Sequence, residues 1–227
     1  VCEQVDGLIE GGADVILIET IFDTLNCKAM IDAALTMMKK HGVELPVMIS
    51  LTVSDLAGRT LSGQTVDAFL ASLSPYPIFS VGMNCAFGAP QMKPFIEHMA
   101  QVAPYYISAH PNAGLPNEMG EYDETPESMA PQIAEFIDEG IVNIIGGCCG
   151  TSPEFIAHYA RIAEGKKPHK VVEKPKYMWL SGLDLLQVDD SVHLPVDASR
   201  FVNVGERCNV AGSRKFLRLI NEKNYEE

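Results

Sequence analysis

Long apolar runs are missing from this sequence of 227 residues. No run approaches the roughly 18 consecutive apolar residues that a membrane-spanning helix needs. Positive charge is also scarce, because 17 Lys and Arg stand against 30 Asp and Glu and give a formal net charge of −13. Binding to nucleic-acid phosphates requires clustered Lys and Arg on a basic surface. We therefore expect neither a membrane nor a nucleic acid among the partners of this chain.

Closely spaced cysteine pairs of the C-x-x-C type are missing as well. The six cysteines are too few for the disulfide framework of a small secreted domain, and two of them are adjacent, at Cys148 and Cys149. Adjacent cysteines suit metal binding in a reducing compartment better than they suit disulfides. We therefore expect a cytoplasmic protein.

Short apolar runs alternate with amphipathic helical stretches from residue 13 to about residue 164. The runs that predict strands cover residues 15–18, 46–53, 78–84, 105–109 and 142–145. Such alternation is typical of an α/β fold with βα units around a parallel sheet, which can be an open doubly wound sheet or part of a barrel. No G-x-G-x-x-G follows the first run, and polar residues follow four of the five runs. The missing motif argues against dinucleotide binding. The polar residues favour the barrel, because an open sheet gathers its site at one switch point.

Three segments are expected along the chain. Residues 1–165 carry the βα units, and Thr24 is expected to cap the helix that ends at Gly42. Residues 166–200 lack periodicity, contain several prolines and lysines, and are predicted to form an interdomain linker with a short hairpin. In residues 201–227 the sequence predicts a strand at 201–204, then a loop and a helix. We interpret these elements as the first βα unit of a second domain. Because both ends read as interrupted helices, we expect a fragment that is inactive on its own.

Three cysteines follow predicted strands. Cys85 follows the third strand, and Cys148 and Cys149 follow the fifth, so a closed sheet would bring them to one edge. Zinc takes thiolates readily, and a catalytic zinc site keeps three protein ligands and one open position. Two alternatives stay open at this point: the cysteines are small buried residues of a packed barrel end, or the zinc is structural, with His110 as its fourth ligand.

The cysteine motif resembles a known family. Residues 146–153, read as GGCCGTSP, together with Asn84 and Cys85, resemble the zinc signature of the homocysteine S-methyltransferases, and residues 19–23, 58–63 and 110–116 also match. The resemblance implies a (β/α)8 TIM barrel that is present only as its C-terminal five βα units. It implies the zinc ligands Cys85, Cys148 and Cys149, with no catalytic residue beyond the zinc site.

The last segment resembles one branch of that family. Residues 201–216 are similar to the opening of the pterin-binding barrel of the cobalamin-dependent methionine synthases, although Cys208 stands where Thr is usual. The resemblance implies that homocysteine is methylated to methionine with a methyl group from methyltetrahydrofolate. The carrier would be methylcobalamin, bound by a module outside this chain. Betaine-dependent or S-methylmethionine-dependent relatives, and an inactive fragment with a structural zinc site, are the alternatives.

The resemblance also implies substrate-binding residues. Glu19 would hold the substrate ammonium, and Asn112 would lie beside the metal. The plain alternatives are that Glu19 caps a helix and that Asn112 only shapes a turn. His110 is expected to be a packed loop residue rather than a ligand. No role is assigned to the following residues: Cys2, Cys27, Glu206, Cys208 and Asn209.

Overall fold

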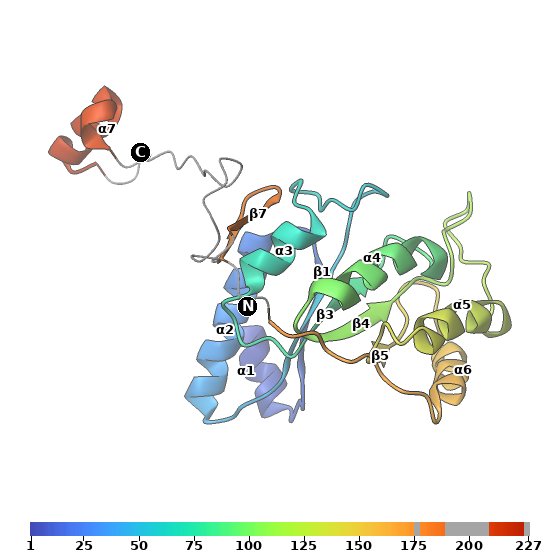
Figure 1. Ribbon diagram of the computed structural model, residues 1–227. Coiled ribbons are helices and arrows are strands. Elements are labelled where there is room, and N and C mark those ends of the chain that lie inside the picture. The colour runs from blue at the N-terminus through green and yellow to red at the C-terminus, as the bar shows by residue number, and fades with distance from the viewer. Residues whose placement is uncertain (175–177, 189–208, 225–227) are drawn as a thin grey trace. The chain divides into compact units, whose positions relative to one another are not determined.

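The computed structural model describes residues 1–174, 178–188 and 209–224. The chain divides into two compact units, residues 1–190 and 191–227. The first unit is built on a parallel sheet of five strands (Figure 1). Its strands are β1 (Ile16–Ile21), β2 (Val47–Leu51), β3 (Ser80–Asn84), β4 (Tyr106–His110) and β5 (Ile144–Ile145). Among the described helices, none has the length and apolar character required to cross a membrane.

The strands of the sheet lie side by side in chain order, from β1 to β5. A doubly wound sheet reverses its strand order at a switch point, whereas a (β/α)8 barrel adds each new strand beside the last. The predicted parallel α/β fold is therefore confirmed, and the strand order is that of an arc of a barrel.

Helices connect the strands, as the alternating pattern predicts. They are α1 (Cys2–Glu10), α2 (Thr24–His41), α3 (Val66–Leu73), α4 (Ala89–Val102), α5 (Pro126–Asp138) and α6 (Pro153–Ala163). The prediction that Thr24 caps α2 is wrong. Asp23 is the cap and accepts hydrogen bonds from the backbone N–H groups of Leu25 and Asn26. The Thr24 hydroxyl instead donates to Gln64 Oε1 at 2.7 Å.

The two faces of the sheet differ in composition. Ile49, Val81 and Ile107 occupy one rung across three strands and are fully buried in the core shared with the helices. The next rung, on the opposite face, consists of Ser50, Gly82 and Ser108. A Cβ at Gly82 would lie 1.8 Å from the Ser108 carbonyl oxygen. Only glycine at this position therefore allows β3 and β4 to approach so closely.

A hairpin is present in the predicted linker. It consists of the antiparallel strands β6 (Met178–Ser181) and β7 (Leu185–Val188). The Ser181 hydroxyl donates to the carbonyl of Ala68 in α3, and the N–H of Thr65 donates to the carbonyl of Leu183 at 2.9 Å. The hairpin thus belongs to the first compact unit.

The second unit is described over residues 209–224. It contains a short 3₁₀ helix, η2 (Val210–Gly212), and the helix α7 (Arg214–Glu222). The predicted strand at 201–204, together with Glu206 and Cys208, lies outside the described residues. The start of a second barrel and the boundaries 1–165, 166–200 and 201–227 stay predictions.

Candidate metal centre

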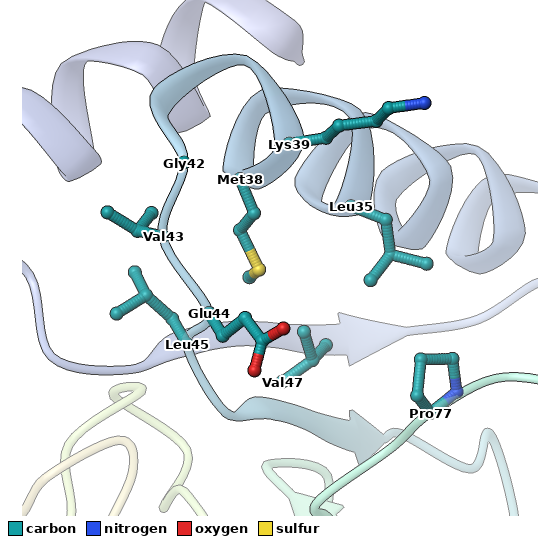
Figure 2. Close-up of a pocket in the computed structure, with 9 residues that line it drawn as sticks. All are labelled: Leu35, Met38, Lys39, Gly42, Val43, Glu44, Leu45, Val47 and Pro77. Atoms are coloured by element: carbon teal, nitrogen blue, oxygen red, sulfur yellow. The ribbon is translucent and has the colours of Figure 1, made fainter.

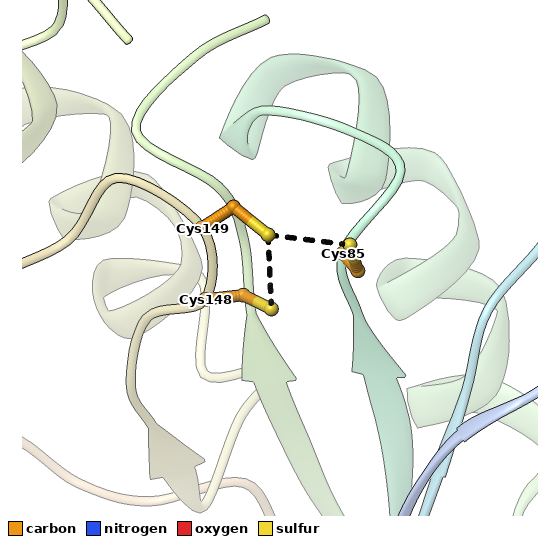
Figure 3. Close-up of side chains that lie close together, drawn as sticks. All are labelled: Cys85, Cys148 and Cys149. Carbon is orange, nitrogen blue, oxygen red and sulfur yellow. Dashed lines mark hydrogen bonds between the residues drawn. The ribbon is translucent and has the colours of Figure 1, made fainter. Parts of the chain in front are cut away.

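Three thiols converge beyond the carboxyl ends of β3 and β5 (Figure 3). Cys149 Sγ lies 3.6 Å from Cys85 Sγ and 4.0 Å from Cys148 Sγ. All three sulfur atoms lie within 4.8 Å of one another. Tetrahedral zinc with sulfur ligands at about 2.3 Å requires sulfur atoms about 3.8 Å apart. The donor set and its spacing therefore fit one zinc ion.

The backbone at Cys85 turns sharply after β3. Cys85 and Ala86 both have left-handed conformations, with φ of 61° and 60°. Residues with a Cβ adopt this conformation rarely, and such strain persists only where surrounding contacts hold it. The Cys85 N–H donates to the carbonyl of His110 at 3.3 Å, which ties the turn to the end of β4. The left-handed turn directs the Cys85 side chain to the other two thiols.

The loop after β5 presents two adjacent thiols to one point. The N–H of Cys148 donates to the Pro111 carbonyl, and the Cys149 carbonyl accepts from the N–H of Ala113, both at 2.9 Å. The Thr151 hydroxyl donates to the Cys148 carbonyl at 2.7 Å. The backbone on both sides of the pair is thus fixed by hydrogen bonds, so little further ordering is needed for these cysteines to bind a metal.

Asn84 connects the thiols to the rest of the sheet. Its side chain is buried, and its Oδ1 accepts from the Thr20 N–H at 3.0 Å and from the Ser50 hydroxyl at 2.7 Å. Its Nδ2 donates to the Thr20 hydroxyl and approaches Cys148 Sγ at 3.8 Å. One amide therefore links β1, β2 and the cysteine loop.

The electrostatics of the cluster also suit a cation. Desolvation, reinforced by the neighbouring thiols, raises the pKa of Cys148 to about 11. Desolvation acts in the same direction on Cys149, but hydrogen bonds from Cys85, Tyr122 and Cys148 outweigh it and bring the pKa of Cys149 below its usual value. Three thiolates this close would repel one another. A divalent metal would remove this penalty.

Cys2, Cys27 and the ring of His110 do not belong to the cluster. Within the described residues, Cys2 is exposed and Cys27 is buried, and neither belongs to the thiol group. Burial lowers the pKa of His110, which keeps its ring neutral. The ring packs on Gly146, where a Cβ would lie 2.4 Å from His110 Cδ2. The histidine is thus a packed residue, as expected, and Gly146 provides the space for it.

A sequence model described as homocysteine S-methyltransferase matches residues 2–163, a span that contains the whole thiol cluster. The chain belongs to the homocysteine S-methyltransferase family. The family predicted from the cysteine motif is confirmed.

A solved structure agrees with this fold. The chain is similar to the homocysteine methyltransferase MmuM from Escherichia coli in its apo form, with a TM-score of 0.50 and 20% sequence identity. The match covers 71% of this chain and 57% of MmuM, so the chain spans little more than half the length of that relative. At this identity the likeness shows the fold.

The two predicted substrate residues of the family site differ in their surroundings. Glu19 lies within β1 and is exposed, so the alternative that it caps a helix is wrong. It alternates with the buried Ile18 and so lies on the face of the sheet opposite the helices. Asn112 is buried, and its Oδ1 accepts from the Cys149 N–H at 3.1 Å. Asn112 therefore also orients a cysteine of the cluster.

Two residues at the site had no predicted role. The sequence pattern marks Asn84 only as the neighbour of Cys85, although a polar residue at the end of a buried strand is a signal of its own. Tyr122, in the loop between β4 and α5, packs against Gly150 beside Cys149, and nothing in its local sequence indicates this.

One pocket of the first unit lies away from the thiols. It has a volume of about 700 Å³ and lies between the end of α2 and the start of β2 (Figure 2). Its lining is mostly apolar and includes Leu35, Met38, Val43 and Leu45. It contains no cysteine and adjoins the amino end of β2, whereas the thiols follow the carboxyl ends of strands. The thiol cluster is therefore the candidate site.

Proposed function

We propose that this chain contributes the thiol-activating site of a homocysteine S-methyltransferase, with Cys85, Cys148 and Cys149 as ligands of Zn²⁺. The convergence of three thiols at a spacing that suits one ion carries the proposal. Membership of the family supports it. When bound, Zn²⁺ would supply a Lewis acid that keeps a thiol as its thiolate, the form that attacks a methyl donor.

The protein side chains would select and orient homocysteine. Three cysteines leave one of four tetrahedral positions for the substrate sulfur. The three negative thiolates exceed the charge of the ion and keep a fourth sulfur electron-rich. Glu19 would hold the substrate ammonium, since no described residue forms an ion pair or hydrogen bond with its carboxylate. Thr20, the residue after Glu19, forms hydrogen bonds with the Asn84 side chain, and Asn84 Nδ2 in turn contacts Cys148 Sγ.

Asn112 would have two roles at the site. The hydrogen bond from the Cys149 N–H to its Oδ1 fixes the cysteine loop. Because this amide lies beside the thiols, it would also occupy the open position before the substrate arrives. The Asn112 carbonyl accepts a hydrogen bond from the Gly114 N–H at 2.8 Å. This bond closes the turn that follows Asn112.

For the methyl source we propose methyltetrahydrofolate, with methylcobalamin on a separate module as the carrier. The resemblance of residues 201–216 to a pterin-binding barrel supports this donor. Betaine or S-methylmethionine is the alternative. The zinc-loaded chain is given homocysteine with methylcobalamin, betaine or S-methylmethionine as the direct methyl donor, and the donor that yields methionine decides between them. Zinc binding without turnover from any donor would favour a structural metal.

The metal site is tested by Cys148→Ser, with Cys2→Ser as the control because Cys2 is exposed and outside the cluster. We expect about one zinc per chain in the unaltered protein, as in mononuclear thiolate sites. Cys148→Ser should lose this zinc under chelator competition, and Cys2→Ser should keep it. Metal analysis after dialysis measures both. Equal zinc content and affinity in Cys148→Ser would refute the proposed site.

A further inference from the structure

The strand β1 contains a bulge at Glu19. Glu19 and Thr20 together stand opposite one residue of β2, because the register shifts between Ile18 and Ile21. Thr20 has a left-handed backbone conformation, with φ of 58°. A β-branched residue rarely adopts this conformation, and it persists only where surrounding contacts hold it. Bulges re-aim the side chains that they carry. The direction of the Glu19 side chain therefore depends on the contacts that hold the bulge.

Asn84 and Gln64 hold the two ends of the segment that follows Glu19. At the first residue, Asn84 Oδ1 accepts from the Thr20 N–H at 3.0 Å, and Asn84 Nδ2 donates to the Thr20 hydroxyl at 2.9 Å. At the last residue, the Thr24 hydroxyl donates to Gln64 Oε1 at 2.7 Å. Thr24 is buried, so water competes little for this bond. The position of the segment thus depends on an amide at each end.

The Gln64 side chain also reaches the hairpin β6–β7. Its Nε2 donates to the Gly182 carbonyl at 3.0 Å. The same loop is joined to the hairpin by Arg59, whose guanidinium donates to Asp184 Oδ1 and to the Gly63 carbonyl, both at 2.8 Å. The hairpin lies beyond the residues that match the family model. One amide therefore connects the start of α2 to a hairpin outside the family match.

We propose that Gln64 is a positioning residue of the substrate site, which braces the bulge carrying Glu19 against the hairpin β6–β7. This inference rests on the proposed function, in which Glu19 holds the substrate ammonium. A binding group that is held in place before the substrate arrives loses less freedom on binding. Among the described residues, the side chain of Gln64 forms hydrogen bonds with Thr24 and Gly182 and with no cysteine. Its loss should therefore weaken recognition of the ammonium and leave zinc binding intact.

The experiment compares the affinities of two thiols for the zinc-loaded chain. Homocysteine carries the ammonium, whereas γ-mercaptobutyrate has the same thiol, chain length and carboxylate without it. Gln64→Leu removes both hydrogen bonds of the amide and keeps a side chain of similar size. Thr24→Val removes the bond between Thr24 and Gln64 from its other end. The control is Gln187→Leu, because the Gln187 amide accepts from Trp179 Nε1 within the hairpin, at 3.2 Å. Calorimetry measures the affinity for each thiol, and chelator competition measures the affinity for zinc.

We expect the unaltered chain to bind homocysteine more tightly than γ-mercaptobutyrate. Gln64→Leu should bind homocysteine about 10-fold more weakly, near the lower end of the range for a hydrogen bond to a charged group. Thr24→Val should lose homocysteine affinity in the same direction. The affinities for γ-mercaptobutyrate and for zinc should stay unchanged in both variants, and Gln187→Leu should match the unaltered chain in every measurement.

Four outcomes would contradict the inference. If Gln64→Leu or Thr24→Val bound homocysteine as tightly as the unaltered chain, the inference would be overturned and the zinc site would stand. An equal loss of affinity for both thiols, or a loss of zinc affinity, would also overturn it, because Gln64 would then support the fold in general rather than Glu19. Equal binding of the two thiols by the unaltered chain would refute the role of Glu19, and the inference with it. Failure of the unaltered chain to bind zinc or homocysteine would refute the proposed function as well.

Discussion

The two faces of the five-stranded sheet stabilise the protein in different ways. On the helix side, Ile49, Val81 and Ile107 are 0% exposed and form a continuous apolar rung. Burial of such side chains contributes about 1.5–3 kcal/mol each to folding. One residue further along, the rung made by Ser50, Gly82 and Ser108 buries little hydrocarbon.

The polar face nevertheless supports the candidate site. Asn84 lies on it and joins three parts of the chain by hydrogen bonds. Apolar burial on one face therefore provides stability, whereas close backbone approach and satisfied polar groups on the other face fix the positions of the site residues. Substitutions on the two faces should therefore affect stability and metal binding differently.

The largest effect is expected from Gly82→Ala. The added Cβ would lie 1.8 Å from the Ser108 carbonyl oxygen and 2.2 Å from its Oγ, and backbone cannot move aside as a flexible side chain can. Overpacking of this kind costs about 3 kcal/mol or more. Urea denaturation should show the loss of stability, or the variant should fail to accumulate as folded protein.

Gly7→Ala is the matched control for Gly82→Ala. Gly7 lies in α1, and a Cβ there meets nothing within 4 Å. Alanine is favoured over glycine inside a helix by about 1 kcal/mol, so this variant should be more stable. If Gly82→Ala were as stable as the unaltered chain, like Gly7→Ala, the backbones of β3 and β4 would not approach each other as closely as described.

Asn84→Ala on the polar face and Ile107→Ala on the helix side should differ in their effects on stability and on zinc affinity. Asn84→Ala removes the acceptor of the Thr20 N–H and the Ser50 hydroxyl, at a cost of about 1–3 kcal/mol for buried groups left unpaired. Ile107→Ala leaves a cavity on the helix side and costs about 2–5 kcal/mol. Only Asn84→Ala should also weaken zinc binding, by about 10-fold, because its amide contacts Cys148.

Denaturation and chelator competition on the same preparations measure both quantities. If Ile107→Ala, under conditions where it is folded, weakened zinc binding as much as Asn84→Ala does, the division of roles between the two faces would be wrong.

The parts that the sequence predicts correctly depend on local patterns. Apolar runs mark the buried parallel strands. Because the carboxyl ends of parallel strands share one edge, Cys85 could be grouped with Cys148 and Cys149 across more than sixty residues of sequence. The edge rule needs only the strand order, so it predicts the cluster without any knowledge of side-chain contacts.

The parts that sequence reasoning misses depend on contacts between distant segments. Thr24 has the composition of a helix cap, but its hydroxyl bonds to Gln64, forty residues away, and leaves the cap to Asp23. The role of Asn84 depends on Thr20, sixty-four residues earlier. Neither partner can be predicted from local spacing, because each depends on how loops meet above the sheet.

The smallest effect, expected from Ser80→Ala, tests whether the polar face is stabilised by its hydrogen bonds. Ser80 is buried on this face, and its hydroxyl has no hydrogen-bond partner among the described residues. Removing an unpaired buried hydroxyl should leave stability unchanged or raise it by up to about 1 kcal/mol. Ser50→Ala is the matched variant, because the Ser50 hydroxyl donates to Asn84 Oδ1. It should lose about 1 kcal/mol. Urea denaturation of both variants resolves this difference, and an equal loss in the two would mean that hydroxyl packing, rather than the bond to Asn84, stabilises this face.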